Sequence, residues 1–194
     1  MDKALFIQRL GAYIIDYIII FIIGTLIATF IVDAEKVNEL SEKSNLIIEQ
    51  FMEGEITQKE YLDESIELTY LISKEQVIFS GIYILIMLVY YVGYQFVNKG
   101  QTLGKKLLKI KVVAVDGKLN FWLFLLRSLF INMIFISIVS LFFVLFGDIK
   151  LFNYYAYLEL IFSVFMVVSL CMMVFRKDCR GLHDLFAKTE VVKL

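Results

Sequence analysis

Four stretches of the sequence are long and apolar enough to cross a lipid bilayer as helices. They cover residues 10–32, 76–97, 121–146 and 154–175, with boundaries approximate to a few residues. A hydrocarbon core of about 30 Å requires about 20 apolar residues in helical form, and lipid offers no partner to the backbone of a single strand. Composition agrees, because 60% of the 194 residues are hydrophobic and the mean hydropathy is +0.77. We therefore expect an all-α integral membrane protein, a four-transmembrane-helix bundle that forms a single membrane domain over residues 1–194.

Several classes of protein are excluded by the same composition. Two cysteines, Cys171 and Cys179, cannot hold a chain of this length together as a disulfide scaffold. With His183 as the single histidine, no soft four-ligand metal site can be assembled from histidine and cysteine alone. No serine or cysteine has a histidine or carboxylate at the spacing of a known nucleophile motif. We expect no enzyme, no metal, no cofactor and no nucleic-acid partner.

The orientation of the helices follows from the basic residues in the connections. Lysine and arginine accumulate in residues 1–9, in the 98–120 connection and in the tail 176–194, whereas the 33–75 connection has twelve acidic and four basic residues, a net charge of −8. Basic connections remain in the cytoplasm. We therefore expect both termini in the cytoplasm of a multi-pass plasma-membrane protein, with the 33–75 insert outside.

The acidic insert is expected to form a helical hairpin. Apolar residues recur at helical spacing, Gly54 is a natural break, and Thr57 followed by Glu60 has the pattern of a capping box at the start of a second helix. The acidic surface could concentrate cations at the outer mouth of a pathway, or it could simply be a solvated face.

The basic 98–120 connection has a different pattern. A valine-rich run ends at Asp116 and Gly117, a pair typical of a tight turn. We expect a small cytoplasmic β element formed by residues 110–115, 118–121 and 189–192, which would attach the tail beneath the bundle. The lysines of this connection would also attract anionic lipids at the cytoplasmic face.

Three charged residues within the expected membrane helices require an explanation. An isolated charge near the bilayer centre costs about 2.5–3.5 kcal/mol on insertion scales, so Asp16, Arg127 and Glu159 need partners or a wet cavity. Asp16 and Arg127 lie at similar depth in the first and third helices, which predicts an ion pair between them. Arg9 is too far along the first helix to contact Asp16, and we expect it to meet lipid headgroups or a carboxylate of the tail, for which Asp184 is the candidate.

Two interpretations of the predicted pair remain open. It could merely hold two helices in register, or Asp16 could exchange a proton for a cation while Arg127 lowers its proton affinity. Glu159 could relay protons or extend its carboxylate to the outer interface. Asn132, with Ser137 and Ser140, could line a polar path between Asp16 and Glu159, although small polar residues often only bond to a neighbouring helix. The tyrosines of the second helix are expected to pack or to form an aromatic belt.

Three segments together resemble one family of membrane proteins. "QRLGAYIIDYIII" contains Arg9 and Asp16, "GQTLGKKLLKIKVV" contains Gly100, Gly104 and Lys105, and "RGLHDLFAKTEVV" contains His183 and Asp184. In this order and spacing they resemble the RDD family, which is named for one arginine and two aspartates. The resemblance assigns those roles to Arg9, Asp16 and Asp184, and matches Arg127 to an arginine early in the third helix. Leu103 stands where the family more usually has proline, and the acidic insert is longer than typical.

The resemblance implies transport, with cation/proton antiport proposed for some members of the family. We expect a small transporter that exchanges monovalent cations for protons, as a homodimer because four helices make a thin wall for a pathway. The alternative is a scaffold or accessory protein that binds a membrane-protein partner through the acidic hairpin or the basic connection. His183 could titrate near neutral pH beside Asp184, or the tail could form a turn that docks on the basic connection.

Overall fold

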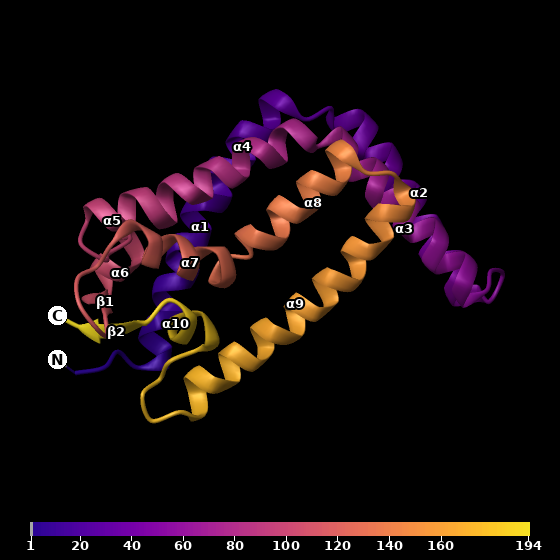
Figure 1. The fold of residues 1–194 in the computed structure, drawn as a ribbon. Helices are drawn as coiled ribbons and strands as arrows, with labels where there is room; N and C mark the ends of the chain where they lie inside the picture. Colours follow the sequence, from indigo (N-terminus) through magenta and orange to yellow (C-terminus); the bar gives the residue numbers. More distant parts are fainter. Residues whose placement is uncertain (1) are drawn as a thin grey trace. The chain divides into compact units, whose positions relative to one another are not determined.

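The computed structural model describes residues 2–194, which form helices and one two-stranded sheet (Figure 1). In chain order the elements are α1 (Phe6–Ile31), α2 (Ala34–Glu53), α3 (Gln58–Glu75), α4 (Val77–Leu88), the π-helix η1 (Val89–Tyr94), α5 (Gln95–Val97), α6 (Leu103–Leu107), β1 (Ile110–Ala114), α7 (Phe121–Ile131), α8 (Ile134–Phe146), α9 (Ile149–Phe175), α10 (Leu182–Phe186) and β2 (Thr189–Lys193). The fold divides into two compact units. Unit 1 contains the chain up to Gly24, Tyr83–Phe135 and Ile161–Leu194, and unit 2 contains Thr25–Ile82 and Ile136–Leu160.

Three helices of the described chain are long and apolar enough to cross a membrane by themselves. They are α1, the continuous run Val77–Val97 and α9. The expected third helix consists instead of α7 and α8, which are bent by 72° at a short break, and it counts as a fourth span if the pair crosses as one. Helix α1 begins at Phe6 and α9 at Ile149, each a few residues earlier than the apolar patterns predicted.

The break between α7 and α8 contains no proline or glycine, the residues that commonly interrupt helices. Asn132 ends α7, and Met133 adopts a left-handed φ of 56°. This conformation is uncommon for a residue with a side chain. The length of the apolar run 121–146 therefore could not predict the bend.

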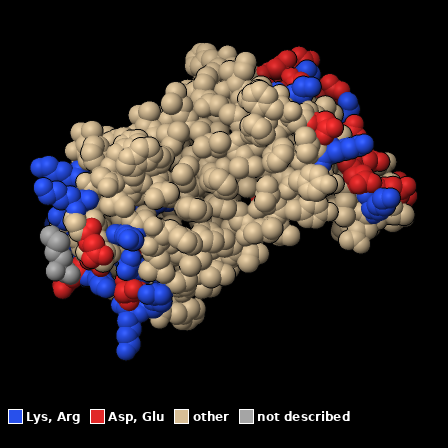
Figure 2. Space-filling model, viewed as in Figure 1, with Lys and Arg blue, Asp and Glu red and all other residues tan. Residues whose placement is uncertain are grey.

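In unit 2 the acidic insert forms the predicted helical hairpin. Gly54 ends α2 with a φ of 76°, and the Thr57–Glu60 capping box begins α3. Lys36 and Glu75 close the open end of the hairpin with an ion pair of 2.6 Å, while the rings of Phe51 and Tyr61 stack near the turn. Acidic side chains predominate on its surface in Figure 2.

In unit 1 the tail is held by a sheet, as predicted in part. β1 and β2 pair antiparallel, with Val112 opposite Val191, and Lys3 forms an isolated bridge with Val192. Residues 118–121 do not join the sheet, because the chain after the turn enters α7, which Asn120 caps with its side chain. Apolar residues from the N-terminal segment, α1, η1, the sheet and α7 form the core of this unit, namely Ala4, Ala12, Val92, Ile110, Val112, Phe124 and Val191.

An aromatic cluster joins α7, α9 and α10 within unit 1. Phe130 stacks on Phe162 and Phe186, with ring centroids 6.1 and 5.8 Å apart, and also contacts Phe165. Such contacts contribute about 0.5–1.5 kcal/mol each beyond the area they bury. They hold α10, which carries His183 and Asp184, against the long helices.

A buried charged cavity in unit 1

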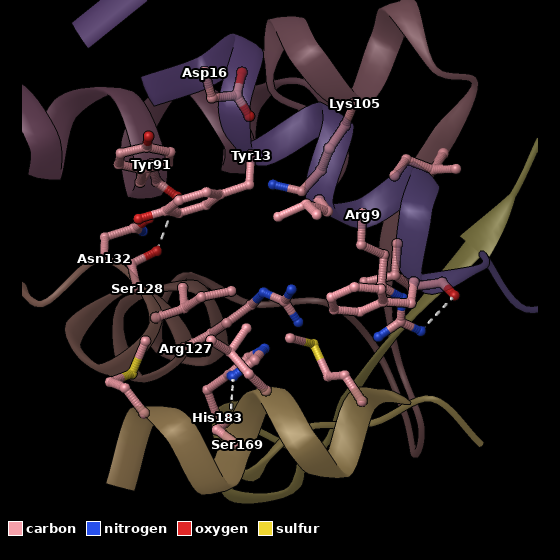
Figure 3. Close-up of a pocket in the computed structure, with 18 of the residues that line it drawn as sticks. Arg9, Tyr13, Asp16, Tyr91, Lys105, Arg127, Ser128, Asn132, Ser169 and His183 are labelled. Carbon is pink, nitrogen blue, oxygen red and sulfur yellow. Dashed lines mark hydrogen bonds between the residues drawn. The ribbon is translucent and has the colours of Figure 1, made fainter. Parts of the chain in front are cut away.

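Unit 1 encloses a cavity of about 210 Å³ whose wall combines apolar and charged side chains (Figure 3). Phe6, Leu10, Met166 and Met173 are typical of the apolar part of the wall. Polar side chains from α1, α5, α6, α7, α9 and α10 also face it, namely Arg9, Asp16, Gln95, Lys105, Arg127, Asn132, Ser169 and His183. The cavity therefore gathers the charges that the sequence places far apart.

Asp16 is bound entirely by hydrogen-bond donors that are not basic side chains. Its Oδ1 accepts from the hydroxyl of Tyr90 at 2.6 Å and from the backbone N–H of Gly104 at 2.7 Å, and its Oδ2 accepts from the hydroxyl of Thr102 at 2.5 Å. The Tyr90 oxygen accepts from the N–H of Leu103, so its own proton points to Asp16. All three contacts of the carboxylate are therefore with hydroxyls or a backbone N–H.

Local backbone structure explains how these donors reach Asp16. Tyr90 lies in the π-helix η1, whose wider turn changes the direction in which its side chains point. Thr102 caps α6, and Gly104 lies so close to α1 that an added Cβ would meet the Ala12 carbonyl oxygen and lie 2.9 Å from Asp16 Oδ1. Glycine at this position allows the backbone to approach the carboxylate.

Asp184 is the centre of a second buried network. Arg9 Nη1 donates to its Oδ2 at 3.2 Å, while Arg127 Nη1 pairs with its Oδ1, to which the Thr189 hydroxyl also donates at 3.3 Å. Arg9 additionally donates to the carbonyls of Ala4, Cys179 and Val191. Two guanidinium groups thus share one carboxylate that is 0% exposed, which ties the N-terminal segment and the tail to α1 and α7.

Lys105 extends its amine towards the cavity between these two networks (Figure 3). The side chain as a whole has intermediate exposure, but its amine is surrounded by protein. Nζ lies 3.4 Å from Thr102 Oγ1, the same oxygen that donates its proton to Asp16. Burial lowers the pKa of Lys105 to about 7, with a further lowering by the charge of Arg127 and a partial compensation by Asp16.

His183 lies on the side of the cavity formed by α9 and α10. Its Nδ1 contacts Ser169 Oγ at 2.9 Å, and Ser169 Oγ already accepts from the N–H of Leu182, so its hydroxyl proton is available to Nδ1. The other nitrogen, Nε2, is buried with no hydrogen-bond partner among the described residues. Burial lowers the pKa of His183 well below its ordinary value, helped by Arg127, Arg9 and Lys105. This direction argues against the expectation that His183 titrates near neutral pH. The tail contacts the basic connection through the pairing of β2 with β1, while Asp184 is bound by Arg9, Arg127 and Thr189.

The structure corrects one prediction about charge and confirms another. Asp16 does not pair with Arg127, because Tyr90, Thr102 and Gly104 occupy its oxygens and Asp184 occupies Arg127. The predicted contact between Arg9 and Asp184 is present. Asp184 of the tail therefore pairs with Arg127 as well as with Arg9.

The remaining candidate residues fall in different places. Asn132 lines the cavity of unit 1, whereas Glu159 belongs to unit 2, where it is exposed and Tyr155 lies within hydrogen-bonding reach. Gly100 has a φ of 96°, and a Cβ there would meet the carbonyl oxygen of Val112 in β1. Its role is to let the basic connection pack against the sheet.

Three polar residues of the site were missed at the level of sequence. Tyr90 was grouped with packing tyrosines, and Thr102 and Ser169 were not singled out. The available signal was the position of Thr102 three residues before Lys105, which is the spacing of an N-cap. A hydroxyl that both caps a helix and reaches a carboxylate cannot be recognised from spacing alone.

The fold and the site together define a helical membrane protein with a buried, charge-paired cavity. The model of the RDD family matches residues 3–188, almost the whole chain, and the protein belongs to this family. No curated protein and no solved structure matches the chain. Family membership and the apolar helices indicate a membrane protein.

Proposed function

We propose that this protein is a multi-pass transporter of the plasma membrane that exchanges a monovalent cation for a proton. The single observation that carries the proposal is the chain of contacts Asp16–Thr102–Lys105 at the wall of the cavity. In this chain of contacts the amine, whose pKa burial lowers to about 7, and the carboxylate contact the same hydroxyl. The distribution of basic residues supports a topology with both termini in the cytoplasm.

Lys105 carries the exchanged proton in this proposal. A lysine serves this purpose only when its pKa is brought close to the working pH, and burial beside a second cation does so here. The titratable and charged groups that face the cavity with it are Asp16 and Tyr13 of α1, Tyr91 of η1, Arg127 of α7, His183 of α10 and Arg9 of α1. Of these groups, Asp16 raises the pKa of Lys105 by favouring the charged amine, whereas Arg127 lowers it.

The cation takes the place of the proton near Asp16. When Lys105 releases its proton, the carboxylate loses its neighbouring positive charge, while Asp184 keeps both of its arginines. A monovalent cation near Asp16 restores the balance, and a proton returning to Lys105 expels it by repulsion. Because the cation and the proton compete, the movement of one is coupled to the movement of the other although both are never bound together.

Proteoliposomes with an internal pH dye test this function under imposed Na⁺, Li⁺ and K⁺ gradients. We expect proton flux from the wild type and at least a tenfold loss in Lys105→Met, Lys105→Arg and Asp16→Asn, because methionine carries no proton and arginine does not release one near pH 7. Lys106→Met is the matched control, since the Lys106 amine is exposed against Tyr94 and Asn98. Wild-type flux from folded, inserted Lys105→Met would refute the proposed exchange.

A second candidate function is a scaffold that binds a membrane-protein partner through the acidic hairpin. Its support is the exposure of large apolar side chains on this hairpin, with Met52 79% and Leu46 57% exposed. Deleting residues 36–73 separates the two functions. A transporter retains flux after the deletion, whereas a scaffold loses its partner in a pull-down.

A further inference from the structure

We propose that the end of the unit 1 cavity at Arg127 and His183 binds the carboxylate of a small organic anion. This site is separate from the Asp16 end, where the exchange was proposed, and no part of the exchange depends on it. The end of the cavity at Arg127 and His183 has an excess of positive charge, and His183 Nε2 has no hydrogen-bond partner among the described residues.

The charge balance at this end of the cavity is positive. Arg9 and Arg127 share the single carboxylate of Asp184, while Asp16 is occupied by three donors at the other end. Both contacts that Arg127 makes, with Asp184 and Thr189, use Nη1. Arg127 also lines the cavity, and a guanidinium, with its five N–H donors, is well suited to bind a second carboxylate.

His183 supplies a second, independent indication of a ligand. The side chain is 1% exposed and its Nε2 has no hydrogen-bond partner among the described residues, although Asp184 Oδ2 lies 3.5 Å away. In the tautomer in which the Ser169 hydroxyl donates to Nδ1, the proton of the neutral ring is on Nε2, and this is the tautomer that the proposal requires. Figure 3 shows this ring directed towards Arg127 and the cavity. A buried donor without an acceptor is destabilising, and an anionic ligand would supply the missing acceptor.

The rest of the wall defines the body of the ligand. Met166, Leu170, Met173 and Ile131 give the cavity an apolar lining beside the donors. Its volume of about 210 Å³ is several times the roughly 30 Å³ that one water occupies in the liquid. These properties fit a carboxylate with a short acyl chain better than a halide or a highly charged phosphate. The same group is offered by a free short-chain acid or by a fatty acid from the bilayer.

Thermal unfolding and titration calorimetry on the purified full-length protein in detergent test the proposal with sodium butyrate as the probe. We expect butyrate to bind and to raise the unfolding temperature, while 1-butanol and sodium chloride at equal concentration do not. Laurate is the second arm, and its displacement of butyrate would assign the bilayer as a source of the same carboxylate. Equal stabilisation by butyrate and 1-butanol would overturn the proposal, as would no effect of butyrate on folded wild type.

Variants locate the site and separate it from the exchange. His183→Leu should weaken butyrate binding at least tenfold, and Ser169→Ala should weaken it severalfold because the ring loses the hydroxyl that fixes its proton on Nε2. Ser163→Ala, on the same helix but outside the cavity, is the matched control. Asp16→Asn should abolish exchange and retain butyrate binding, because Asp16 lies at the other end of the cavity and is no donor to an anion, which makes failure of either proposal distinguishable.

The tests include the case in which a variant is merely misfolded. Because Ser169 Oγ also accepts from the Leu182 N–H, Ser169→Ala should lower the unfolding temperature of the unliganded protein to some extent, and its butyrate affinity is measured at a temperature at which the variant is still folded. Unchanged affinity in folded Ser169→Ala and His183→Leu would overturn the assignment of the site.

Discussion

Individual residues in this protein owe their behaviour to what surrounds one or two of their atoms. Lys105 and Lys106 are adjacent in the sequence, yet one amine is enclosed beside Asp16 and the other is exposed against Tyr94. The resemblance marked Lys105 as a motif position, but the direction of its side chain depends on the start of α6 at Thr102. The cap of α6 at Thr102 therefore determines which of the two amines faces the cavity.

The buried amine of Lys105 should make stability depend on pH. Its folded pKa of about 7 is below the unfolded value, so the unfolded state binds more protons between pH 7 and 10.5 and stability rises with pH over this range. Lys105→Met removes the cost of burying the charge. We expect the unfolding free energy of this variant to exceed that of the wild type by about a few kcal/mol below pH 7, with the gain declining towards pH 10.5. A gain that is independent of pH would contradict this explanation.

Gly104 should tolerate no side chain. Gly104→Ala would push a Cβ against the Ala12 carbonyl and the Asp16 carboxylate, and we expect a loss of about 1–3 kcal/mol in unfolding free energy. Gly93→Ala is the control, because no atom lies within 4 Å of its added Cβ. Equal stability of the two variants in a thermal melt would refute the close approach of α6 to α1.

At the scale of elements, apolar length and cap patterns predicted most of the fold. The hairpin of α2 and α3 follows from Gly54 and Thr57, whose effects are local. The bend at Asn132 and Met133 could not be predicted, because no residue there forbids a continuous helix. The predicted partner of Asp16 was wrong because similar depth in the membrane identifies only charged partners, whereas the donors to Asp16 are two hydroxyls and a backbone N–H.

The docking of α10 should depend on the charge of Asp184. Asp184→Asn leaves Arg9 and Arg127 without a shared counter-charge in the interior, and we expect a loss of roughly 3–5 kcal/mol. Asp178→Asn is the matched control, because its pair with Arg176 is at the surface and contributes about 0–1 kcal/mol. Chemical unfolding in detergent measures both, and equal losses would show that the buried network has no special role.

At the scale of the whole molecule, the chain combines apolar helices that carry few charges with an acidic connection at residues 33–75 and a basic connection at residues 98–120. Figure 2 shows the acidic surface of the hairpin and the basic residues around the sheet and the tail. The topology proposed from these charges is tested by introducing single cysteines, Ser41→Cys in α2 and Gly117→Cys after β1, into a chain without Cys171 and Cys179. A membrane-impermeant maleimide should label position 41 and not 117 in intact cells; the reverse pattern would invert the topology.

The most direct test of the central claim is proton release from the purified protein when a cation is added. At pH 7 in weak buffer with a pH dye, Na⁺, Li⁺ or K⁺ should release up to one proton per wild-type chain, and none from Lys105→Met. The release should shrink well above pH 7, where Lys105 has already lost its proton. Release of the same size from folded Lys105→Met, or no release from the wild type with any of the three cations, would contradict the account.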